Sequence, residues 1–183
     1  MSKILFLDIE TTGFSRDWDE IIEIAAILID ANTGKDIDSF HEYIKPKRNI
    51  TPKITNLTRI TNAQVANCRS EQIVLMDFSE WVTISNADIV VGHNCKSFDL
   101  NFIKARCDKF GIKWTSPQTI VDTLALARQL NKEGIIKTEN NQQPTLAKYF
   151  GVTYEAHSAI EDTKALIKIY NKMTTIRNED VGF

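Results

Sequence analysis

Two acidic residues, Asp8 and Glu10, end an apolar run near the start of the chain, where residues 4–7 have the length of a buried strand. Side chains alternate across a β-strand, so residues at positions i and i+2 point to the same side, about 7 Å apart. A charge is costly to bury unless it is paired or bound to a metal. The spacing predicts a cation site at the end of this strand; the alternative is a pair of solvated acids.

Two more acids, Asp99 and Asp162, are each expected in the first turns of a helix. Asp162 lies on the apolar stripe of the last helix. Successive residues are about 100° apart around a helix axis, so the residues of this stripe share one face, which should pack on the core. The Asp162 carboxylate should therefore point inward. His157 comes five residues earlier. On one helix, His157 and Asp162 would lie about 140° apart. We therefore expect His157 on the loop before the helix if the two share a site.

Four inward carboxylates and one loop histidine define a type of chemistry. Hard oxygen ligands favour Mg²⁺ or Mn²⁺ over zinc. Two such ions about 4 Å apart can activate a water molecule and stabilise the leaving oxygen of a phosphodiester. A neutral histidine is a suitable base for that water. The residues alone thus predict metal-assisted phosphoester hydrolysis, and they leave the substrate open.

The elements that must hold these residues follow from the apolar periodicity. Strands are expected over residues 4–7, 21–29, 36–44, 88–92 and 119–122. The main helices are expected over residues 71–84, 98–110, 123–130, 144–150 and 158–173. Glu23, inside the second strand, is expected to be a structural acid rather than a ligand. Residues 131–143 should form a mobile polar loop, and we predict one domain over residues 1–173 with a disordered tail over 174–183.

Length and composition are consistent with one ordinary folded domain. The 183 residues carry a formal net charge of −2, which argues against a strongly basic nucleic-acid coat but allows a local groove. The three cysteines are scattered without CxxC spacing, as free thiols in a reducing compartment would be. No apolar run approaches membrane-spanning length, so we expect a soluble, cytoplasmic protein that does not bind a membrane.

Three segments resemble the exonuclease motifs of the DEDDh family, which contains the proofreading epsilon subunit of bacterial DNA polymerase III. They are Asp8-Ile9-Glu10-Thr11-Thr12-Gly13, His93-Asn94 with Phe98-Asp99, and His157-Ser158-Ala159-Ile160-Glu161-Asp162. The resemblance runs from about residue 3 to 170. The H-x-A-x-x-D form of the last segment separates this branch from relatives that use tyrosine there. Arg59 stands where many members have glycine, so the loop around it departs from the family pattern.

The resemblance implies an α/β fold of the ribonuclease H-like type, with a mixed five-stranded sheet flanked by helices. It also implies 3′→5′ exonuclease activity that releases nucleoside 5′-monophosphates. By position, it makes His157 the general base, and it assigns two Mg²⁺ or Mn²⁺ ions to Asp8, Glu10, Asp99 and Asp162.

The resemblance further implies that the 3′-terminal nucleotide of a single strand contacts the turn after the first strand. The candidate contacts are Thr11, Thr12, Gly13, Phe14 and Asn94. Phe14 either stacks on a base or packs under its own loop. Asn94 and His93 have an alternative role as supporting residues at a crowded strand end.

Three functions are compatible with these residues. The first is a DNA-directed exonuclease, and the second is an RNA-trimming or oligoribonucleotide exonuclease with the same chemistry. The third is a nucleic-acid-binding module that has lost activity, although no expected metal ligand is missing. A DNA polymerase is a candidate partner. The sequence has no long C-terminal extension that could bind one, so the residues leave a stable association open.

Overall fold

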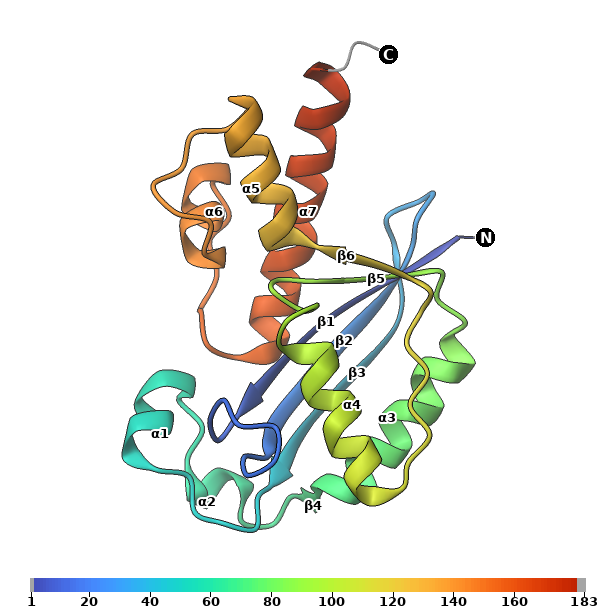
Figure 1. The fold of residues 1–183 in the computed structure, drawn as a ribbon, viewed down its shortest axis with the longest axis vertical. Helices are drawn as coiled ribbons and strands as arrows, with labels where there is room; N and C mark the ends of the chain where they lie inside the picture. The colour runs from blue at the N-terminus through green and yellow to red at the C-terminus, as the bar shows by residue number, and fades with distance from the viewer. Residues whose placement is uncertain (1, 181–183) are drawn as a thin grey trace.

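One mixed β-sheet forms the centre of the computed structural model, which describes residues 2–180. Its strands are β1 (Lys3–Thr11), β2 (Ile21–Asp30), β3 (Asp36–Lys45), β4 (Arg69–Ser70), β5 (Ile89–Gly92) and β6 (Thr119–Asp122). Their order across the sheet is β4-β3-β2-β1-β5-β6. The first three strands form an antiparallel meander, and β5 and β6 continue the sheet in parallel with β1, as Figure 1 shows.

The α/β fold with a mixed sheet flanked by helices is confirmed, and all five expected strands are present. The described chain has a sixth strand, β4, which pairs with the end of β3. This strand has only two residues, so it is too short to show any alternation of apolar and polar side chains. The sheet therefore has one more strand than the five expected, and the additional one is the short edge strand β4.

Helices cover both faces of the sheet (Figure 1). They are α1 (Pro52–Thr58), α2 (Asn62–Val65), α3 (Glu71–Ser85), α4 (Asp99–Phe110), α5 (Thr123–Glu133), α6 (Gln143–Phe150) and α7 (Ala159–Asp180). Side chains of α3 and α4 form the core with one face, and α7 packs on the other, with α5 and α6 beside it. Within residues 2–180, no helix is both long enough and apolar enough to cross a membrane.

The last helix is longer than expected. It continues to Asp180, seven residues beyond the predicted end at Met173. Met173 is the last apolar residue of this helix that is fully buried among the described side chains, which is why the apolar pattern stops there. Adding a residue to an existing helix needs no new nucleus, so the helix can continue without a buried face. Residues 174–180 are thus helical, and residues 181–183 of the expected tail lie outside the described residues.

The segment 131–143 was expected to be a mobile polar loop, and it is anchored instead. Helix α5 continues to Glu133 and ends at Gly134 in the left-handed conformation. Ile136 is then fully buried against α5, α6 and α7. The Asn131 side chain also donates to Thr138 Oγ1 and to Asn141 Oδ1, at 2.8 and 2.7 Å. The polar composition of the segment gave no sign of these side-chain hydrogen bonds, because they join residues that are seven and ten positions apart in the sequence.

Candidate active site

Strand β1 points Asp8 and Glu10 toward the face of the sheet that α7 covers. Leu7 packs into the core under α3 and α4, whereas Phe6 packs with Leu166 of α7 on the other face. Asp8 and Glu10 follow Phe6 at intervals of two, so strand alternation places them on its face. The same-face arrangement predicted from their spacing is confirmed.

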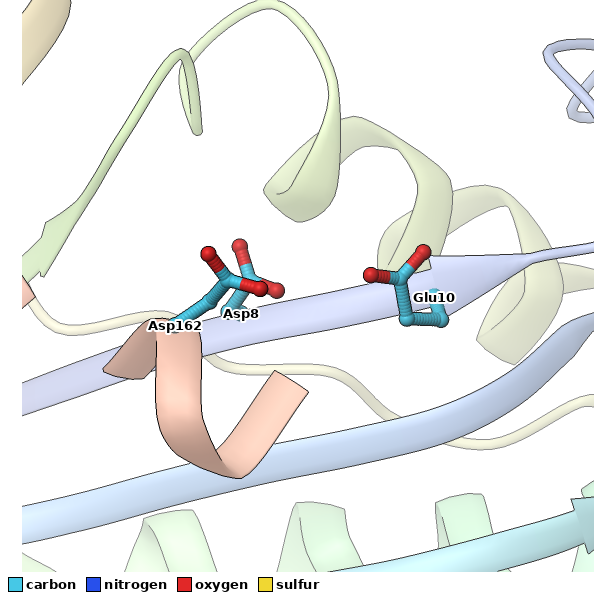
Figure 2. Close-up of side chains that lie close together, drawn as sticks. All are labelled: Asp8, Glu10 and Asp162. Carbon is cyan, nitrogen blue, oxygen red and sulfur yellow. The ribbon is translucent and has the colours of Figure 1, made fainter. Parts of the chain in front are cut away.

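Asp162 brings a third carboxylate to this point from the first turn of α7. Its backbone N–H donates to Ser158 O at 2.8 Å, which closes that turn. Carboxylate oxygens of Asp8, Glu10 and Asp162 all lie within 4.8 Å of one another. Figure 2 shows Asp162 beside Asp8, with Glu10 further along the same strand. The inward orientation predicted for Asp162 is therefore confirmed.

The three carboxylates resist ionisation when no cation is present. Burial is the largest cause that raises the pKa of Asp8 well above its usual value, and the charges of Asp99 and Asp162 add to it. Burial and neighbouring acids raise the pKa of Glu10 to about 8, and burial also raises that of Asp162. In their ionised forms the three carboxylates repel one another, and a divalent cation would offset that repulsion. Three such oxygen donors match the ligand set of a hard divalent cation. The residues present therefore fit Mg²⁺ or Mn²⁺.

Asp99 is close to this group without belonging to it. Its Oδ1 accepts a hydrogen bond from Ile9 N–H at 3.2 Å, between the two acids of β1. The side chain is buried, and burial raises its pKa to about 7. Its charge is the largest electrostatic contribution to the raised pKa of Asp8. The described structure thus brings three of the four predicted ligands together and leaves Asp99 adjacent to Asp8.

His157 lies on the loop before α7, as the angular argument predicted. It has a φ of 75°, in the left-handed region, and its backbone N–H donates to Asp162 Oδ2 at 2.8 Å. Its side chain is exposed. His157 lines a pocket of about 340 Å³ together with the three clustered carboxylates and Asn94. A histidine with an accessible imidazole therefore opens onto the same space as the acids.

Two residues that the sequence did not indicate contact Asp162. Gln143 Nε2 donates to both the backbone oxygen and Oδ1 of Asp162, each at 3.0 Å. Burial and the charge of Asp162 raise the pKa of Tyr154, whose buried hydroxyl has no hydrogen-bond partner among the described residues. A glutamine next to a proline at a helix start is ordinary, so no local pattern could have identified Gln143.

The turn after β1 is braced internally. The pairing register shifts between Glu10 and Thr11, where β1 leaves β2. Thr11 Oγ1 donates to Gly13 O at 2.6 Å, and Thr12 Oγ1 donates to Asp19 Oδ1 at 3.1 Å. A Cβ atom on Gly13 would lie 2.4 Å from Asp19 Oδ2. Both threonine hydroxyls therefore stabilise the conformation of the turn, and the absence of a side chain at Gly13 leaves space for the Asp19 carboxylate.

Phe14 projects from this turn into solvent. Its side chain is 80% exposed, and its ring centroid lies 6.1 Å from that of Phe98 in an edge-to-face arrangement. Packing underneath the loop, one of the two expected alternatives, is therefore not what the structure has. An exposed aromatic ring that packs edge-on against Phe98, the residue before Asp99, is available for stacking.

His93 and Asn94 lie at the end of β5, on the wall of the same pocket. His93 Nδ1 forms a hydrogen bond of 3.0 Å with Thr123 Oγ1, whose hydroxyl can also donate to Gly92 O. Burial lowers the pKa of His93 to about 4, which keeps the ring neutral. Asn94 has a φ of 64°, and its N–H donates to Asp122 Oδ1 at 3.0 Å.

Asp122 organises the turn that contains Asn94. In addition to Asn94, the N–H groups of Lys96 and Leu124 donate to its carboxylate, at 3.1 and 3.0 Å. This acid therefore supports the strand end and is outside the group of clustered oxygens.

The protein-family model RNase_T, described as Exonuclease, matches residues 5–170. The chain is 37% identical over 172 residues to the PolC-type DNA polymerase III of Caldanaerobacter subterraneus subsp. tengcongensis. It is 36% identical over 167 residues to the PolC-type DNA polymerase III of Staphylococcus aureus. These matches cover 93% and 91% of this chain but only 11% of each curated relative.

Solved structures share the fold at lower identity. Exonuclease I of E. coli in complex with a dT13 oligonucleotide superposes with a TM-score of 0.86 at 23% identity, covering 98% of this chain and 42% of that one. Cell-death related nuclease 4 superposes with a TM-score of 0.79 at 18% identity, covering 96% and 64%. E. coli exonuclease I has also been solved with single-stranded DNA in a zinc-bound form.

Proposed function

The chain belongs to the exonuclease family, and from this premise we propose that it is a metal-dependent 3′→5′ exonuclease. It would hydrolyse the terminal phosphodiester of single-stranded DNA and release nucleoside 5′-monophosphates. The observation that carries the proposal is the convergence of Asp8, Glu10 and Asp162 oxygens within 4.8 Å, in the pocket that His157 lines. A cluster of acids with a purely structural role would not need three carboxylates whose ionisation burial makes unfavourable.

We assign the ligands of two Mg²⁺ or Mn²⁺ ions by position. Asp8, Glu10 and Asp162 would hold one ion, and Asp99, next to Asp8, would contribute to the second. When bound, two such ions stabilise the charge that develops on the phosphate and on its leaving oxygen. Gln143 keeps the Asp162 carboxylate oriented through its two hydrogen bonds.

His157 is the proposed general base. Its role is to take a proton from the attacking water. A residue in this role needs an imidazole that can reach the cleft and return to solvent. Exposure of the side chain and its place on a loop support this role. His93 is a poorer candidate because burial lowers its pKa to about 4, so it is a weak base.

DNA is the proposed substrate class because the sequence relatives are named for DNA and a structural neighbour was solved with DNA. The sequence relatives are DNA polymerases, and exonuclease I was crystallised with a dT13 oligonucleotide. A DNA polymerase is accordingly a proposed partner. The turn of Thr11, Thr12 and Gly13, the Phe14 ring and Asn94 would contact the 3′-terminal nucleotide.

The test is a degradation assay on matched single-stranded DNA and RNA with Mg²⁺ or Mn²⁺, followed by chromatography of the products. We expect stepwise shortening of DNA from the 3′ end with release of 5′-monophosphates. A bulky block on the 3′ hydroxyl should slow release strongly, and a 5′ block should not. Rapid cleavage of a closed single-stranded circle would contradict exonuclease action, and faster loss of RNA would make RNA the substrate. Asp8→Ala is the inactive control.

A further inference from the structure

Glu23 of β2 is a fully buried acid that the proposed chemistry does not use. It lies opposite Glu10 in the β1–β2 register, yet it is not one of the acids whose oxygens cluster within 4.8 Å. A buried carboxylate is costly unless hydrogen bonds compensate it. The partners of Glu23 therefore indicate why the acid is there.

Those partners lie immediately after His157 in the chain. Ser158 Oγ donates to Glu23 Oε1 at 3.2 Å, and the Ala159 N–H donates to Oε2 at 3.0 Å. From the neighbouring strand, His41 Nε2 donates to Oε1 at 2.8 Å. Glu23 thus connects the middle of the sheet to the loop that carries His157.

We propose that Glu23, held in place by His41, is a positioning residue that fixes the His157 loop for catalysis. This inference rests on the proposed function, because it assigns a purpose to His157. The carboxylate accepts the Ala159 N–H, which has no intrahelical partner at the start of α7. It also holds the Ser158 side chain, so both residues that follow the histidine are fixed to β2.

The rest of α7 does not depend on Glu23. Leu166 and Ile169 are buried against the sheet and the neighbouring helices, and Gln143 holds Asp162. Loss of Glu23 should therefore release the loop while α7 and its metal ligand stay in place. A catalytic group that is misplaced by about 1 Å can cost about 10²-fold in rate. The effect should consequently appear in kcat rather than in metal affinity.

Three substitutions separate positioning from charge. Glu23→Ala removes every bond to the loop. Glu23→Gln keeps the shape, since its oxygen can accept from Ala159 N–H while its amide faces Ser158 Oγ and His41, and it removes the charge. His41→Ala removes only the outer support of Glu23 and leaves a partly exposed surface site, so it should fold normally. Ser79→Ala, which deletes a partly buried hydrogen bond to Lys113 O on the far side of the sheet, is the control for general destabilisation.

The kinetic test is a double-mutant cycle with His157→Ala. We expect Glu23→Ala to lower kcat about 10- to 100-fold with little change in KM or in the Kd for Mn²⁺. Glu23→Gln should stay within about threefold of the unmodified protein, and His41→Ala should fall between the two. In the His157→Ala background, Glu23→Ala should add no further loss, because the group it positions is gone. Additive losses, or an equal loss in Glu23→Gln, would overturn the proposal.

A second measurement does not depend on activity. Amide hydrogen exchange at Ala159 should become about 10- to 100-fold faster in Glu23→Ala, since a hydrogen bond to a charged group is lost, and it should be almost unchanged in Ser79→Ala. Unchanged protection in Glu23→Ala would disprove the positioning role whatever the kinetics. A protein without any nuclease activity would instead disprove the proposed function, and exchange would still show whether Glu23 fixes this loop.

Discussion

The residues of the acidic cluster differ in how they are held. Asp162 is fixed on both oxygens, by Gln143 Nε2 and by the His157 N–H. Asp99 is held by the Ile9 N–H. Asp8 has no such hydrogen bond among the described residues, and burial and neighbouring charge dominate its pKa. A bound cation would therefore offset the unfavourable charge of Asp8 most directly, and substitutions at this residue should reveal the electrostatic cost of bringing these carboxylates together.

The metal-free protein should lose stability as pH rises. The pKa of Glu10 is raised to about 8 and that of Asp99 to about 7, so the folded state holds protons that the unfolded chain has released. Their stabilising contribution is complete below about pH 4 and is lost as pH rises through about 7–8. In EDTA, Tm should fall between pH 5 and pH 9. Mg²⁺ or Mn²⁺ should restore it at the upper end.

Asp8→Asn provides the matched variant for that titration. It removes one buried carboxylate at constant shape. Because burial raises the pKa of Asp8 well above its usual value, this group contributes to the loss of stability at rising pH. In EDTA, the Tm of the variant should therefore fall less between pH 5 and pH 9 than that of the unmodified protein. Hydrolysis should fall by about 10²–10³-fold or more. A variant with near-normal turnover in Mg²⁺ would contradict the ligand assignment.

Removing the imidazole of His157 should separate the roles of base and ligand. We expect His157→Ala to lose about 10²–10⁴-fold in kcat while it keeps Mn²⁺ binding and affinity for single strands. The rise of the wild-type rate with pH should be absent in the variant. Calorimetry with Mn²⁺ and pH–rate profiles of both proteins are the measurements. Loss of metal binding would make His157 a ligand, and an unchanged profile would make it a bystander.

At the level of elements, the turn between β1 and β2 is the least replaceable connection. Its two threonine hydroxyls and the Asp19 carboxylate bond within the turn, and Ser15 N–H also donates to Asp19 Oδ2 at 2.9 Å. This network belongs to the turn from which the Phe14 ring projects into solvent. The conformation of one loop thus determines where a terminal base could stack.

Gly13→Ala should disturb this loop specifically. The added Cβ would displace the Asp19 carboxylate from Thr12 and Ser15, at a cost of about 1–3 kcal/mol in unfolding free energy. KM for an oligonucleotide should rise, with a smaller change in kcat. Asp19→Ala should cause a similar loss, and the double variant should be no worse than Asp19→Ala because the clash is gone. Additive effects on Tm and KM would show that the two residues act separately.

At the level of the whole molecule, the two faces of the sheet are packed differently. The face under α3 and α4 is an apolar core, whereas the α7 face combines apolar packing with the acids at the end of β1. The chain corresponds to 11% of its PolC-type relatives, and this part alone contains all the residues of the candidate site.

Truncation should locate the boundary of the folding unit predicted at residue 173. Met173 is fully buried, and residues 174–178 are at most half-buried, so removing residues 174–183 should change unfolding free energy by no more than about 1 kcal/mol. A cut after Leu166 also removes Ile169, Tyr170 and Met173 from the core and should unfold the protein. Circular dichroism during heating distinguishes the two results. A large loss from the shorter truncation would place the boundary further along α7.

The sequence by itself determined five of the six described strands, most helices and the identity of the acids. Alternation along β1 and the 3.6-residue period of α7 are local properties, so they could be read without knowing what packs where. Both put carboxylates on inward faces, and the structure agrees for Asp8, Glu10 and Asp162. The end of α7 could not be found this way, because its last turns bury no apolar stripe.

Only the tertiary structure decided which side chains meet. It leaves Asp99 next to the cluster instead of inside it, sets Gln143 on Asp162, and joins Glu23 to Ala159 across 136 positions of the chain. None of these contacts has a periodic signature, since each depends on how a helix is placed against the sheet. Residue types and their spacing thus fixed the chemistry that is available. The packing of α7 on the sheet, and of α6 against α7, determined how that chemistry is supported.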